Sequence, residues 1–88
     1  MKQITITNRE LLRKAAVLRQ HEAYAYQASY YLLEDEPLAA RAASDTLAAL
    51  LQDDSFYILS LELQKQQVKR MVIKHALQIK VSVLQPSQ

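Results

Sequence analysis

The sequence contains no glycine. Glycine is the residue that most readily adopts positive φ, which tight hairpins, many helix C-caps and phosphate-binding loops require. A chain without glycine is poorly suited to short β-hairpins and cannot form a Walker loop or a dinucleotide-binding fingerprint. This feature therefore predicts long helices joined by brief breaks.

The length and composition set further limits. With 88 residues, of which 50% are hydrophobic, the chain is expected to form one domain, residues 1–88, with enough apolar material for a core. The absence of cysteine excludes disulfides and thiolate metal sites, and fits a reducing compartment. The sequence has no apolar run of signal-peptide or membrane-span length, so we expect a soluble cytoplasmic protein without membrane contact.

The apolar periodicity predicts an all-α fold of three helices. Thr7 and Glu10 form a capping-box pattern, and three- and four-residue apolar steps then predict a helix as far as about Leu33. Asp35 or Glu36 is expected to cap a second, alanine-rich helix over about 37–52, with Pro37 in its first turn.

The last third of the sequence is ambiguous. Asp54 or Ser55 is a candidate N-cap, and one helix, straight or bent, is favoured over about 56–78. Residues 77–84 alternate in polarity and offer a short strand that would pair with residues 3–7 in the same chain or in a second copy. Short extended segments are therefore expected at both termini.

No arrangement of residues indicates catalysis. The two histidines, His21 and His75, lack a partner at metal-binding helical spacing, and the carboxylates cluster at the predicted helix breaks, where capping explains them. We therefore expect a protein that is not an enzyme and needs no metal or cofactor.

Basic and aromatic residues provide the candidate binding sites. The net charge of +2 is unevenly distributed, with an acidic middle (34–54) and basic flanks. Four cations, Lys65, Lys69, Arg70 and Lys74, are interpreted as one positive stripe that binds nucleic acid, although a solvated helix face explains them too.

Four tyrosines lie in the first predicted helix. Tyr26 and Tyr30 are expected to face the core, while Tyr24 and Tyr31 share the other side and are candidate contacts for a protein partner. An aromatic core edge is the alternative interpretation of all four.

One stretch resembles a known family. Ala23-Tyr24-Ala25-Tyr26, then Ser29 to Glu36, Leu38-Ala39 and Ala42 to Leu47 are similar to region 2 of bacterial RNA polymerase sigma factors of the extracytoplasmic-function type. In that family the second helix docks on the largest polymerase subunit. The resemblance thus implies a partner surface around Arg41, Asp45 and Thr46, with RNA polymerase core as the partner and DNA as a second ligand.

The chain also departs from the family pattern. Arg41 and Ser44 stand where the family usually has an acidic residue and glutamine, and tryptophan is absent. The resemblance therefore implies a truncated or degenerate, transcription-associated relative. The alternative is a homo-oligomeric structural or adaptor protein, joined through alanine-rich faces or terminal strands, that binds no nucleic acid.

Overall fold

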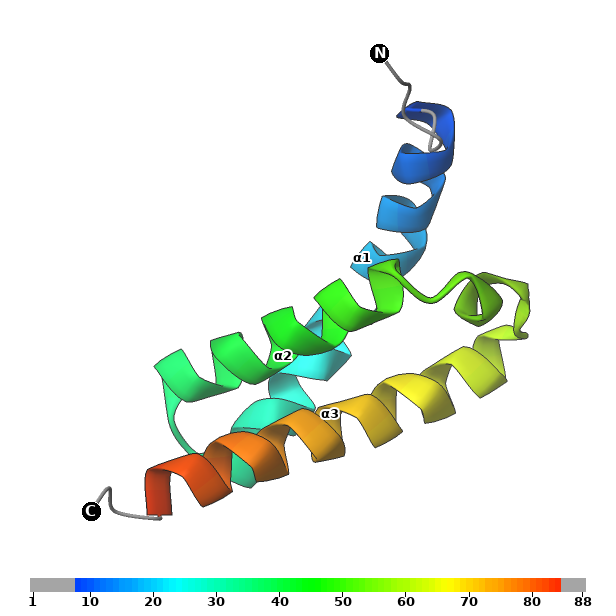
Figure 1. The fold of residues 1–88 in the computed structure, drawn as a ribbon. Coiled ribbons are helices and arrows are strands. Elements are labelled where there is room, and N and C mark those ends of the chain that lie inside the picture. The colour runs from blue at the N-terminus through cyan, green and yellow to red at the C-terminus, as the bar shows by residue number, and fades with distance from the viewer. Residues whose placement is uncertain (1–7, 85–88) are drawn as a thin grey trace.

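The computed structural model describes residues 8–84, which form three α-helices and one short 3₁₀ helix. The elements are α1 (Asn8–Leu33), α2 (Glu36–Leu51), η1 (Asp54–Ile58) and α3 (Leu61–Leu84). Each α-helix packs against the other two, and α2 and α3 run in opposite directions in front of α1 (Figure 1). The all-α, three-helix fold predicted from the sequence is confirmed.

The main core lies where η1 meets the three helices. Phe56 of η1 is fully buried and packs in one apolar cluster with Leu18, Leu50, Val68 and Val72. A second cluster, formed by Ala42, Ala76 and Ile79, closes the other end of the bundle. Small side chains at that end let α2 and α3 approach closely, while the bulky aromatic fills the wider end.

The break between α1 and α2 is built without glycine. Glu34 adopts φ 54°, and its N–H bonds to the Tyr30 carbonyl at 2.7 Å, which closes α1 with a left-handed cap. Asp35 then caps α2 by accepting from the Leu38 N–H at 2.9 Å, and Pro37 occupies the first turn. The predicted Asp35 cap and Pro37 position are confirmed.

The predicted single helix over 56–78 is wrong at its start. Asp53, rather than Asp54 or Ser55, caps η1 by accepting from the Ser55 N–H at 3.1 Å. After η1, the Ser60 hydroxyl accepts from the Leu63 N–H at 3.3 Å, and α3 begins at Leu61. Burial of Phe56 favours this interruption, because the 3₁₀ turn directs that ring into the core.

The alternative of a strand over 77–84 is also wrong, because α3 continues to Leu84. Ala76 and Ile79 are buried and prolong the face that begins with Val68 and Val72, so tertiary packing selects the helix despite the alternating polarity. The proposed pairing partners, residues 3–7, lie outside the described residues. Within residues 8–84, none of the helices combines the length and apolarity of a membrane span.

Candidate functional site

A groove of about 420 Å³ lies between α1 and α3. Its lining residues are Gln20, His21 and Tyr24 of α1 and Lys65, Gln66 and Lys69 of α3. The spacing of three and four residues within each set places its members on one helix face. The groove thus joins Tyr24, a predicted partner contact, with two of the four predicted nucleic-acid-binding cations.

His21 is buried beneath this groove and is fixed by a hydrogen-bond chain. Its Nε2 lies 3.1 Å from Gln64 Oε1, and Gln64 Nε2 donates to the Phe56 carbonyl at 3.3 Å. Because an amide oxygen only accepts, His21 Nε2 carries the proton and donates it. The ring also meets Phe56 edge to face, with centroids 5.7 Å apart. The base of the groove is therefore tied to α1, α3 and η1 together.

The exposed part of the groove favours an anion with a planar group. Tyr24 is partly exposed, and the Lys65 and Lys69 side chains reach solvent. No carboxylate lines the groove, so the two ammonium groups set its charge. An aromatic face beside two cations fits a base and its phosphate better than it fits a neutral or positively charged ligand.

The predicted single positive stripe divides into two pairs. All four cations are exposed, but the five-residue step from Lys65 to Arg70, or from Lys69 to Lys74, rotates position by roughly 140° on a helix. Lys65 and Lys69 face the groove, whereas Arg70 and Lys74 lie on the other flank of α3. One straight ligand in the groove therefore contacts only the first pair.

Two of the three residues predicted for a partner surface on α2 are exposed, and the third is buried. Arg41 and Asp45 are exposed one turn apart. Thr46, by contrast, is 0% exposed, and its Oγ1 lies 3.1 Å from His75 Nδ1. Because Nδ1 also lies 3.0 Å from the Met71 carbonyl, an acceptor, Nδ1 carries the proton. Thr46 is thus a contact between α2 and α3, and its assignment to a partner surface is corrected.

The tyrosines are arranged differently from the prediction. Tyr26 and Tyr30, expected to face the core, are 37% and 44% exposed and stack on each other with centroids 6.3 Å apart. Ala25 and Ser29 take the core positions, because the tight helix packing there admits only small side chains. Tyr31 is strongly exposed, as expected for a partner contact, and lies near Tyr26 and Tyr30.

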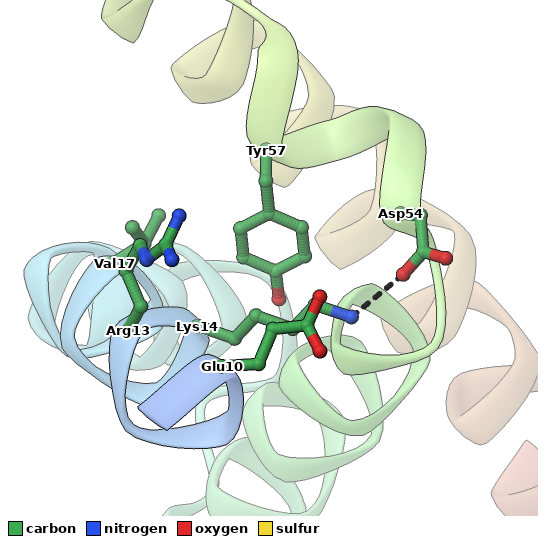
Figure 2. A pocket seen from close by; sticks show the side chains of 6 residues that line it. All are labelled: Glu10, Arg13, Lys14, Val17, Asp54 and Tyr57. Carbon is green, nitrogen blue, oxygen red and sulfur yellow. Dashed lines mark hydrogen bonds and ion pairs between the residues drawn. The ribbon is translucent and has the colours of Figure 1, made fainter. Parts of the chain in front are cut away.

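A second cavity, of about 330 Å³, lies between α1 and η1 (Figure 2). Lys14 Nζ forms an ion pair with Asp54 at 2.6 Å and lies 5.4 Å from the centroid of the Tyr57 ring. The Tyr57 hydroxyl donates to the Leu50 carbonyl at 3.0 Å. The lining combines Glu10 and Asp54 with Arg13 and Lys14, so the charges are mixed. We interpret the contacts around this cavity as structural, because they attach η1 to α1 and α2.

Tyr57 has a raised pKa in this setting. Burial of the phenol is the main cause, and the negative charges of Asp53 and Asp54 add to it. The folded protein therefore holds the phenolic proton more tightly than the unfolded chain does.

The sequence did not indicate Gln20, His21 or Gln66 as site residues. The sequence shows that they lie three or four residues from Tyr24 or Lys69, and therefore on the same helix faces. The pairing of these faces of α1 and α3 depends on tertiary structure. Among residues 8–84, no group of three or more His, Cys, Asp or Glu side chains is placed to hold a metal ion. No protein-family model, curated protein or solved structure matches the chain.

The raised pKa of Tyr57 predicts a loss of stability at high pH. The protonated phenol of Tyr57 contributes a stabilisation that is fully present below the ordinary tyrosine pKa of 10.0. This stabilisation declines as the pH rises through the higher pKa that Tyr57 has in the folded protein. We expect Tyr57→Phe to make the fall in unfolding free energy above pH 10.0 shallower, as measured by urea denaturation. Tyr31→Phe, at an exposed site, is the matched control. Equal slopes for wild type and Tyr57→Phe would contradict this account.

Proposed function

We propose that this chain is a non-enzymatic, transcription-associated protein of the cytoplasm that binds single-stranded nucleic acid in the groove between α1 and α3. The observation that carries the proposal is the position of Tyr24 across from Lys65 and Lys69. The aromatic ring supplies a stacking surface for a base, and the two ammonium groups supply contacts to neighbouring phosphates.

The form of the groove supports a strand over other anionic ligands. The groove is partly open to solvent, which gives a strand access to it. Stacking on Tyr24 needs an exposed base face, which a single strand offers and a duplex hides.

We propose that α2 contacts the protein partner, RNA polymerase core. The resemblance to sigma region 2 assigns this role to the second helix, and Arg41 and Asp45 stand exposed on it. Since α2 contributes no residue to the groove, the two ligands need not compete for the same side chains.

The homo-oligomer alternative is less well supported. Ala39, Ala42 and Ala43 of α2 are buried inside the bundle and are unavailable to a second copy. The other proposed route used a strand over 77–84, which is helical. Within residues 8–84 the strand contact is therefore absent, and the alanine contact is limited to the exposed Ala40 and Ala48 of α2.

The groove predicts a specific loss of nucleic-acid binding. We expect Lys65→Ala with Lys69→Ala to weaken binding of a fluorescent oligothymidine about tenfold near physiological salt, as measured by anisotropy. The slope of log affinity against log salt should become shallower by about 1.4, since each phosphate contact on a single strand contributes about 0.7. Tyr24→Ala should also weaken binding, while Tyr24→Phe retains it.

The matched control is Arg70→Ala with Lys74→Ala, which removes the same charge from the other flank of α3. This pair should change the affinity by less than about threefold, because it affects only the long-range field. Equal losses in the two double variants, or no binding by the wild type, would contradict the groove assignment.

The α2 surface predicts binding to polymerase. Purified protein should co-migrate with bacterial RNA polymerase core in gel filtration at low salt, and Asp45→Lys should abolish this by reversing the charge at the contact. Glu22→Lys, an equally exposed reversal on α1, should leave it intact. Failure of the wild-type protein to co-migrate would remove the polymerase from the proposal and leave the strand-binding result untouched.

A further inference from the structure

An apolar seam runs along the outer face of the second half of α3. It consists of Ile73, Leu77, Val81 and Leu84, whose exposed fractions run from 38% to 70%. Steps of four, four and three residues keep these side chains on one flank of the helix, outside the face that packs on α1 and α2. Four aliphatic side chains exposed in a row differ from the scattered apolar residues of an ordinary surface.

Cations border the seam along both sides and at its amino-terminal end. Lys74 borders one side and Lys80 the other, while Lys69 and Arg70 stand at its amino-terminal end. Lys80 donates to the Leu32 carbonyl at 3.2 Å, a neutral partner that leaves its charge in place. The acidic residue of α3, Glu62, lies in the first turn, far from the seam. The seam is therefore apolar in the centre and positive around its rim.

We propose that this seam docks an amphipathic helix of a protein partner, with an apolar stripe flanked by Asp and Glu. The four seam residues span roughly 80° of the helix circumference, which is close to a coiled-coil seam and matches the contact width of one helix. Acidic flanks on the partner would lie against Lys74 and Lys80. Charge complementarity of this kind sets partner choice and orientation at helix–helix contacts.

A second copy of this chain fits the seam poorly. In a parallel pair each side of one seam faces the other side of its partner, so Lys74 of one copy lies near Lys80 of the other, and in an antiparallel pair the Lys74 sides face each other and the Lys80 sides face each other. Like charges in direct opposition are unfavourable in either arrangement. An anionic membrane is a weaker fit as well, because the narrow seam carries no aromatic residue, whereas interfacial helices present a broad apolar face with tryptophan or phenylalanine.

A synthetic peptide provides the direct test. The probe is a labelled three-heptad helix with leucine at positions a and d and glutamate at e and g. The comparison peptide has the same leucines with lysine at e and g. We expect the acidic peptide to bind wild-type protein at least about tenfold more tightly than the basic peptide, as measured by anisotropy.

Variants connect the binding to the seam. Leu77→Gln with Val81→Gln removes apolar contact at two exposed sites, and glutamine keeps the helix, so the fold should be retained by circular dichroism. This variant should lose at least about tenfold in affinity for the acidic peptide, since the apolar contacts of Leu77 and Val81 with the peptide leucines are removed. Leu12→Gln, at an exposed leucine of α1, is the matched control and should bind as wild type does.

The remaining outcomes decide the proposal. Lys74→Glu should weaken the acidic peptide and strengthen the basic one, which a purely apolar contact would not do. The proposal is overturned if the two peptides bind equally, or if the seam variant binds the acidic peptide as wild type does. It is also overturned if the acidic peptide fails to bind and the wild-type protein instead uses the seam for another contact. That contact would be a dimer in sedimentation equilibrium, or binding to phosphatidylglycerol vesicles, that is lost in the seam variant. Oligothymidine binding reports on the groove and is independent of these results.

Discussion

The hydrogen-bond chain from His21 through Gln64 to Phe56 joins α1, α3 and η1 beneath the groove. It links α1 to α3 and α3 to η1 through atoms 3.1 and 3.3 Å apart. A buried polar group is stabilising only when its partner is in place, so the chain permits one relative position of these elements. That position sets Tyr24 opposite Lys65 and Lys69, and the groove depends on it.

The lack of glycine shapes the rest of the fold. Side chains cap the amino-terminal ends of three elements: Asp35 caps α2, Asp53 caps η1, and the Ser60 hydroxyl satisfies the first turn of α3. Where a left-handed residue is still needed, Glu34 takes it at a backbone cost of about 1 kcal/mol that glycine would avoid. Short connections made in this way keep the three helices in register and place the groove and the seam at successive positions along α3.

Local signals predicted much of this arrangement. The end of α1 and the start of α2 could be predicted from Pro37 and the acidic break, because capping and proline geometry act within a few residues. The break at residues 59–60 could not be predicted, since it depends on burying Phe56 between helices distant in sequence. The same limit applies to the site. Tyr24, Lys65 and Lys69 were predicted separately, and only the packing of α1 against α3 brings them together. Thr46 was misassigned because its partner, His75, lies 29 residues further along the chain.

The central claim is that the His21–Gln64 contact fixes α1 against α3, and a double-mutant cycle in unfolding free energy measures it. His21→Phe and Gln64→Leu, each alone, should destabilise the protein by leaving a buried polar group without its partner. Together they should cost less than the sum, with a coupling of about 1 kcal/mol in urea denaturation. Additive effects of the two substitutions would contradict the account, because the two side chains would then not depend on each other.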